Sequence, residues 1–151
     1  MFKGRDLTQK LSTLMLGQRL GVLSTCGQRQ PYASLVAFAA TDDLLHIVFV
    51  TSRRTRKYAN LAANAKIAML IDNRSGRTSD FQKAMVATAV GTVHEIRKIR
   101  NSRLIRTYLD KHPQLYDFVW SPTCSVLDIQ VEIYHIVERF QQVTLLRMAP
   151  S

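Results

Sequence analysis

The residues whose types and spacing could do chemistry lie in the segment FVTSRRTRKYANL, residues 49–61. The polar members of interest are Thr51, Ser52, Arg53, Arg54, Thr55, Arg56 and Lys57. An apolar run that ends at Val50 precedes them and predicts a strand. Residues 56–63 have a helical composition, and Thr55 is placed to cap that helix. A basic cluster between a strand and a helix start is suited to binding an anion.

The expected helix start adds its own attraction for an anion. A helix N-terminus exposes unpaired N–H groups and carries about half a positive charge. Arg56 can donate two parallel hydrogen bonds to phosphate oxygens, and Lys57 supplies a point charge. Cations at this end oppose the helix dipole, so four of them favour a bound anion. The segment therefore predicts a phosphate site; the alternative is a capped helix whose basic first turn is solvated.

Other catalytic or metal-binding patterns are missing from the sequence. The histidines are His46, His94, His112 and His135, and none has a ligand-type partner at helical spacing. We therefore expect no metal site. There is no nucleophile elbow, P-loop or dinucleotide-binding glycine motif. The adjacent carboxylates of residues 42–43 are typical of a hairpin turn. Any redox chemistry would have to come from a cofactor.

Composition limits the class of protein. A length of 151 residues favours one domain, residues 1–151, and 46% hydrophobic residues allow a core without disulfide staples. The 21 Lys and Arg against 11 Asp and Glu give a net charge of +10, which attracts nucleic acid, anionic membrane or phosphorylated small molecules. Cys26 and Cys124 are expected to be free thiols. With no leader-like or membrane-spanning run, we expect a soluble, cytoplasmic protein.

Hydrophobic periodicity predicts six strands with two or three helices among them. The expected strands are 19–25, 32–41, 44–50, 65–72, 84–96 and 125–138, and the expected helices are 6–16, 56–63, 97–110 and a short piece over 113–120. Gly27 is expected to provide the first turn, Asn64 a left-handed helix end, and Gly91 a bend or close neighbour. The last strand alternates and is expected to be half-buried.

Short connections make most strand pairing antiparallel, and closure into a barrel would remove exposed edges. The expected fold is therefore mainly β with α: a small antiparallel six-stranded barrel with two or three flanking helices. The basic helix expected over 97–110 is more typical of a solvated face than of a nucleic-acid surface, since only Tyr108 could stack on a base. Nucleic-acid binding remains an alternative that rests on charge alone.

An ordered series of segments resembles the FMN-binding split-barrel proteins related to pyridoxamine 5′-phosphate oxidase. The segments are LGVLST with a glycine turn, QPYASLVAF, FVTSRRTRKYANLAANAKIAMLI and AMVATAVGTVHEI. The third is similar to that family's strand, its T-x-x-x-[ST]-R-K helix start, its N-L pair and its next strand. The resemblance covers residues 7–96 well and 124–137 more loosely.

The resemblance implies a split β-barrel homodimer with FMN at the subunit interface. Arg56 and Lys57 would hold the FMN phosphate, with the hydroxyls of Ser52 and Thr55 nearby. The remaining implied contacts are Val50 and Thr51 against the flavin or its ribityl chain, Ser34, Leu35 and Val36 beside the ring, and Asn73 and Arg74 in the same cleft. The implied activity is an FMN-dependent oxidoreductase with an unknown small-molecule substrate. A flavin-binding or redox-sensing protein without turnover, and a deazaflavin or haem in place of FMN, stay open.

The sequence departs from the vitamin B6 oxidases at three places. Those enzymes usually carry a basic residue where this chain has Ser34 and a Lys where it has Ala39. They also carry a C-terminal Trp- and Arg-bearing segment, whereas this chain ends YHIVERFQQVTLLRMAPS. These differences argue against pyridoxamine phosphate as the substrate, and Arg53 and Arg54 have no assigned role.

Overall fold

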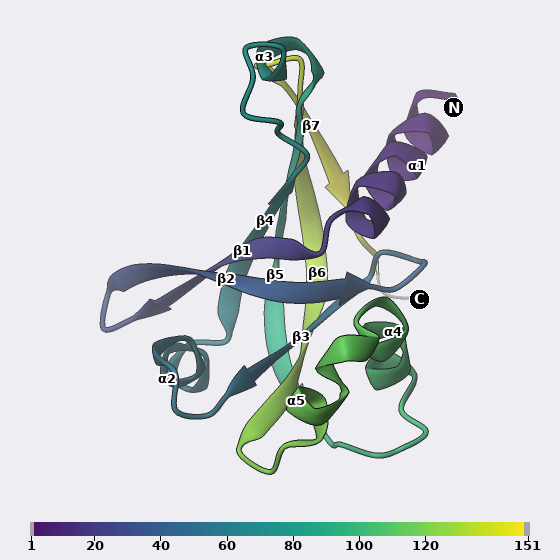
Figure 1. Cartoon of the computed structure of the whole chain (residues 1–151). Coiled ribbons are helices and arrows are strands. Elements are labelled where there is room, and N and C mark those ends of the chain that lie inside the picture. The colour runs from purple at the N-terminus through teal and green to yellow at the C-terminus, as the bar shows by residue number, and fades with distance from the viewer. Residues whose placement is uncertain (1, 150–151) are drawn as a thin grey trace.

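Six antiparallel strands close a barrel, and a seventh strand extends one edge of the sheet (Figure 1). The structure, a computed structural model, describes residues 2–149. The strands are β1 (Leu20–Gly27), β2 (Gln30–Ala40), β3 (His46–Ser52), β4 (Lys66–Asp72), β5 (Met85–Ile96), β6 (Cys124–Glu138) and β7 (Gln142–Arg147). Their order is β3-β2-β1-β4-β5-β6-β7, and pairing of β3 with β6 closes the barrel. The expected six-stranded barrel is thus confirmed, whereas β7 was not predicted.

Helices flank this barrel in four segments of the chain: before β1, and in the β3–β4, β4–β5 and β5–β6 connections. They are α1 (Phe2–Gly17), α2 (Arg56–Ala63), α3 (Asp80–Lys83), α4 (Arg103–Lys111) and α5 (Tyr116–Trp120), with a 3-10 turn over Pro113–Leu115. Figure 1 shows the end of β3 between α2 on one side and α5 on the other. The α4–α5 segment fills the connection from β5 to β6, so residues far from α2 in sequence reach the same end of β3.

The basic helix expected over 97–110 was placed too early. Helix α4 begins only at Arg103, because the Ser102 hydroxyl caps it by accepting from the Ile105 N–H at 3.4 Å. Residues 97–102 form a loop instead. The Lys98 ammonium holds that loop by donating to the carbonyls of Val119, Ser121 and Cys124 at 3.2, 2.6 and 2.9 Å.

Two apolar clusters organise the packing. The main core contains inward side chains of the strands together with Leu11, Leu14 and Met15 of α1. A second cluster joins α4 and α5 to the opposite side of β2, β3 and β6; it consists of Ala39, Val48, Val50, Ile105, Tyr108, Val119, Cys124 and Val126. Strand β6 is therefore covered on both sides over residues 124–129, all of them buried. The expected half-buried alternation holds only from Gln130 onward.

Gly27, which was expected to form the first turn, instead lies where α2 packs on β1. Gln28 and Arg29, with φ of 51° and 63°, make the β1–β2 turn, whereas Gly27 does not have a positive φ. A Cβ at Gly27 would overlap Oδ1 of Asn60, a buried residue of α2. The Asn60 amide donates to the Thr25 hydroxyl at 3.0 Å. Gly27 thus lets α2 pack directly on β1.

Of the expectations for Asn64 and Gly91, the first is wrong and the second is confirmed. Asn64 does not end α2 in a left-handed conformation; it has φ −147°, and its side chain accepts from the Lys66 N–H that begins β4. Gly91 does mark a close approach, as expected. A register shift lies between Val90 and Gly91, and a Cβ at Gly91 would overlap the Gln130 carbonyl oxygen.

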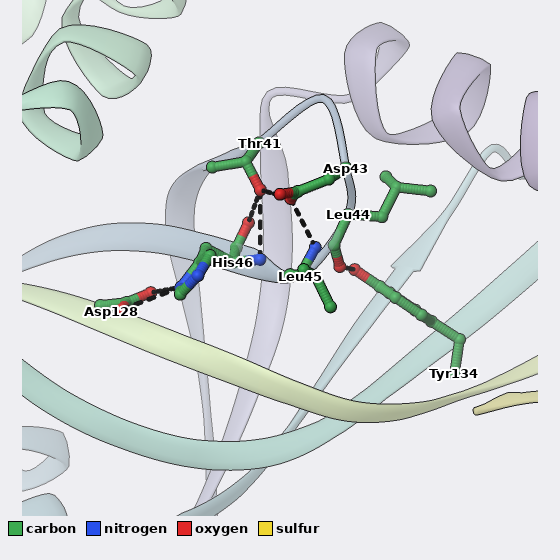
Figure 2. Close-up of polar contacts among 7 residues, drawn as sticks. All are labelled: Thr41, Asp43, Leu44, Leu45, His46, Asp128 and Tyr134. Carbon is green, nitrogen blue, oxygen red and sulfur yellow. Dashed lines mark hydrogen bonds and ion pairs between the residues drawn. The ribbon is translucent and has the colours of Figure 1, made fainter. Parts of the chain in front are cut away.

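The β2–β3 turn confirms that the carboxylates of residues 42–43 belong to a turn. Figure 2 shows Asp43 accepting from the Thr41 hydroxyl at 2.6 Å and from the Leu45 N–H at 3.0 Å. The hydrogen bond from Thr41 lowers the pKa of Asp43. Leu44 takes φ 63°, and its carbonyl accepts from the buried Tyr134 hydroxyl at 2.7 Å. The turn is therefore tied to the barrel core.

Candidate functional site

A groove of about 330 Å³ lies at the end of β3, between α2 and the α4–α5 segment. Its lining residues are Leu35, Val36, Ala37, Val50, Thr51, Ser52, Thr55, Lys57, Tyr108, Leu115 and Phe118. The predicted site residues that it brings together are Leu35, Val36, Val50, Thr51, Ser52, Thr55 and Lys57. Those that do not line it are Ser34, Arg56, Asn73 and Arg74. The cavity thus brings Lys57 and the hydroxyl-bearing residues of the basic segment beside β2, whereas its three arginines lie outside the lining.

The polar end of the groove is the start of α2. Thr55 caps the helix as expected: its hydroxyl accepts from the Tyr58 N–H at 3.3 Å and donates to the Ser52 carbonyl at 2.9 Å. The Thr51 hydroxyl lies 3.0 Å from that of Thr55. These hydroxyls are engaged in building the helix start. Among the backbone hydrogen bonds of the described residues, none uses the N–H of Arg56 or Lys57, so both amides are available to a ligand.

Lys57 is the cation that lines the groove. Its side chain is half-buried, and none of the ion pairs between described residues involves it. Burial lowers the pKa of Lys57, because removing water from the ammonium disfavours its charged form. No acidic side chain is present among the lining residues. An anion would restore the interactions that this ammonium loses on burial. The Arg56 side chain is exposed and outside the lining.

The β2 side of the groove is apolar. Leu35 is 63% exposed at the rim, whereas Val36 is buried. Val50 of β3 continues the apolar surface toward α4. Ser34 precedes this wall but does not line the groove, and its buried hydroxyl has no hydrogen-bond partner among residues 2–149.

Asn73 and Arg74 lie in the β4–β5 connection and serve that turn. The Asn73 side chain accepts from the Met85 N–H at 2.8 Å, and its own N–H donates to the Met85 carbonyl at 3.3 Å. Arg74 pairs with Asp72 at 3.0 Å. Within one chain, neither residue lines the groove.

The α4–α5 wall was missed by the sequence analysis. It contributes Tyr108, Leu115 and Phe118 to the groove. Tyr108 is 1% exposed, its hydroxyl has no hydrogen-bond partner among the described residues, and burial raises its pKa. Ile105 and Tyr108, at helical spacing, form the buried face of α4. Nothing in that spacing indicated which strands the face would cover.

Several cations counted as free charge in the sequence make internal contacts. Lys98 binds three carbonyls, as described above. Arg53 donates to the Pro122 carbonyl at 2.7 Å. The Arg100 guanidinium lies 4.3 Å from the centre of the Trp120 ring and donates to the Tyr116 hydroxyl. These contacts hold the loops around α5, so part of the positive charge serves to position the groove wall.

Two further findings concern residues 2–149. In that range no group of three or more His, Cys, Asp and Glu side chains is arranged to hold a metal ion, and both cysteines are free. No helix in it has the length and apolar character needed to cross a bilayer.

Comparison with known proteins places this barrel in a family. No curated protein matches the chain. The heme binding protein from Mycobacterium smegmatis is similar in structure, with a TM-score of 0.81 and 16% identity over 93% of this chain but 57% of its own. General Stress Protein 26 from Bacillus anthracis str. Sterne has a TM-score of 0.71 and 21% identity, over 94% of this chain and 98% of its own. A FAD-binding protein from Mesorhizobium loti has a TM-score of 0.65 and 16% identity, over 85% of this chain and 91% of its own. At these identities the likeness shows the fold. The family model described as pyridoxamine 5′-phosphate oxidase matches residues 7–137, and the chain therefore belongs to that family.

Proposed function

We propose that this protein binds FMN in the groove at the end of β3 and acts as a flavin-dependent oxidoreductase on a small molecule. The observation that carries the proposal is the half-buried ammonium of Lys57, which has no carboxylate partner and lies at the polar end of an otherwise apolar groove. A buried charge is costly unless it is paired. A ligand with a phosphate at one end and an aromatic ring at the other satisfies both parts of the groove.

The residues present fit such a ligand. The amides of Arg56 and Lys57 and the Lys57 ammonium would bind the phosphate, while the Arg56 guanidinium would close over it from the exposed side. Val50 and Thr51 would lie along the ribityl chain, and Leu35 and Val36 would flank the ring. FMN, when bound, supplies hydride transfer. The chain's own contribution is to orient the ring and to exclude water with its apolar walls.

Whether the protein turns over a substrate is a separate part of the proposal. The titratable side chains lining the groove are Lys57 and Tyr108, and neither is assigned as a proton donor to substrate. A flavin carrier or redox sensor is therefore the competing function. Stopped-flow reduction by NADH or NADPH distinguishes the two: we expect bound FMN to be reduced faster than free FMN, and equal rates would favour the carrier.

Haem is a second candidate ligand, since the structural neighbour from M. smegmatis is described as heme-binding. Haem iron in proteins is held by His, Cys, Met or Tyr. The groove lining contains no His, Cys or Met, and its one Tyr is a protonated phenol. FMN is therefore favoured. An absorption spectrum of the purified protein, followed by release and identification of the chromophore, separates FMN, deazaflavin and haem.

We further propose a homodimer with FMN at the subunit interface. Leu35 and Phe118 form an apolar rim with exposures of 63% and 38%, which a second copy would cover. Ser34, Asn73 and Arg74, outside the groove of their own chain, would contact FMN only in such an assembly. Light scattering of the purified protein should give twice the mass of one chain. A monomer that retains FMN would contradict the interfacial site.

The phosphate assignment is tested by changing Arg56 and Lys57 together to Ala. We expect FMN retention to be lost and the fold to be unchanged, because both residues lie at the surface end of α2. Fluorescence quenching on FMN titration measures the affinity, and circular dichroism checks the fold. The charge-matched control changes Arg54 and Arg106 to Ala, since both are exposed and outside the groove. Undiminished affinity in the first variant, or an equal loss in the control, would refute the assignment.

A further inference from the structure

A buried hydroxyl without a partner lies in the apolar wall of the groove. Tyr108 of α4 lines the groove and is 1% exposed, yet no donor or acceptor among the described residues bonds its hydroxyl. Leaving a buried polar group unpaired costs free energy that the fold must supply. Buried hydroxyls are nearly always satisfied, so an exception beside a cavity points to a group that binds there.

The other fully buried tyrosine shows that this barrel can satisfy such a hydroxyl. Tyr134 donates to the Leu44 carbonyl at 2.7 Å (Figure 2). A polar side chain beside Tyr108 is already engaged elsewhere. The His112 ring lies 4.9 Å from the Tyr108 ring, but its Nε2 is 2.7 Å from the Phe38 carbonyl oxygen. Among the described residues, the buried side-chain atoms of Ser34, Trp120 and Ser125 also lack a partner, but of these four residues Tyr108 is the one that lines the groove.

The surroundings of Tyr108 indicate which part of a ligand it would meet. It belongs to the apolar cluster with Val50, Ile105 and Val119, and Leu115 packs against that cluster. Burial raises the pKa of Tyr108, so the phenol keeps its proton at neutral pH and acts as a donor. A donor in this apolar region would meet the ring of an amphipathic ligand rather than its phosphate.

We propose that the Tyr108 hydroxyl donates a hydrogen bond to an oxygen or nitrogen of the bound flavin ring. This inference rests on the proposed function and adds a ring-positioning residue from α4, outside the basic segment that would hold the phosphate. The hydrogen bond would fix the ring against β2 and β3. It would also offset in the complex the cost that the unpaired hydroxyl imposes on the free protein.

The test compares Tyr108→Phe with the wild type against two ligands, FMN and riboflavin, which lacks the phosphate. The substitution removes one oxygen atom and leaves the ring. We expect the Kd for both flavins to rise by about fivefold, the value of one neutral hydrogen bond. The absorption bands of the bound flavin should also shift. The thermal midpoint of the ligand-free variant should equal or exceed that of the wild type, because an unsatisfied group has been removed from the interior.

Two control variants separate the roles. Tyr134→Phe breaks a satisfied buried hydrogen bond, so it should lower the thermal midpoint and leave both Kd values unchanged. Lys57→Met should weaken FMN and leave riboflavin nearly unaffected. Unchanged Kd values and spectra in Tyr108→Phe would overturn the inference while the proposed function stands. A loss for FMN alone would overturn the assignment to the ring. Failure of the wild type to bind FMN would overturn both proposals.

Discussion

At the scale of single residues, this chain buries polar groups in two distinct ways. Asp128 is 4% exposed, but His46 Nδ1 lies 3.0 Å from both of its oxygens, and Figure 2 shows the pair between β3 and β6. Burial raises the pKa of Asp128, and the histidine partly offsets that rise. Tyr108, by contrast, has no such partner. Asp128 is thus a buried polar group with a partner inside the fold, whereas the proposed partner of the Tyr108 hydroxyl is a bound ligand.

Lys111 gives a prediction for pH dependence at this scale. Its ammonium donates to the Met15 carbonyl at 2.8 Å and lies 4.0 Å from the centre of the Phe38 ring. Burial, reinforced by the charge of Arg19, lowers the pKa of Lys111 to about 8, from 10.5. Between those values the unfolded chain binds more protons than the folded one. Stability attributable to Lys111 should therefore increase as pH rises from about 8 to 10.5.

Chemical denaturation of the wild type and Lys111→Met over this range checks the sign. The free energy of unfolding of the wild type, minus that of the variant, should rise between pH 8 and 10.5. Taking the difference cancels the groups that titrate alike in both proteins. A difference that falls with pH would show that Lys111 is stabilised as a cation in the folded state.

At the scale of elements, the groove depends on how the α4–α5 segment is fixed to the barrel. Residues 97–110 were predicted to form one basic helix. In the structure Lys98 and Arg100, together with Arg53 from the β3–α2 connection, instead hold loops together. Periodicity predicts a helix face but not the strand on which the face packs. For this reason Tyr108, Leu115 and Phe118 were absent from the predicted site, whereas the predicted residues Thr55 and Lys57, which follow β3 directly, do line the groove.

Lys98→Met tests this dependence on the loop. The variant leaves the carbonyls of Val119, Ser121 and Cys124 without their charged donor. We expect the free energy of unfolding to fall by about 2 kcal/mol, the size of a hydrogen bond to a charged group. FMN affinity should also fall, because α5 carries Phe118. The neighbouring Arg97→Met is the control, since Arg97 is exposed. Equal stability of the two variants would show that the carbonyls are satisfied by water.

At the scale of the whole molecule, barrel closure was predictable and its seventh strand was not. Alternation and short turns indicated the strands that form the barrel, because each buries one face in a common core. Strand β7 pairs only with β6, and its Val143 and Leu145 stay 60% and 49% exposed. Because none of its residues is fully buried, it leaves a weak signature in the sequence. Gly91, in contrast, was recognisable because a glycine inside a long strand marks a bulge or close contact.

Gly91 therefore gives the prediction that concerns the barrel as a whole. It lies at the register shift between β5 and β6, where a Cβ would overlap the backbone oxygen of Gln130. Backbone cannot rotate away as a side chain can, so Gly91→Ala must displace one strand of the closed barrel. We expect a loss of about 2–4 kcal/mol in the free energy of unfolding, in the range of severe steric substitutions.

The matched control is Gly21→Ala, in which the new Cβ would meet flexible side-chain atoms of Met69 and Ile71 at 3.3 Å. These side chains can shift by a few tenths of an ångström, so the loss should be clearly smaller. Urea denaturation of both variants gives the comparison, and FMN titration of the folded fraction adds a second readout. The groove lies on β2, β3 and α2 rather than on β5, so folded Gly91→Ala should keep its affinity. A similar stability for the two variants would mean that the barrel absorbs the strain at the bulge, and that closure does not depend on glycine there.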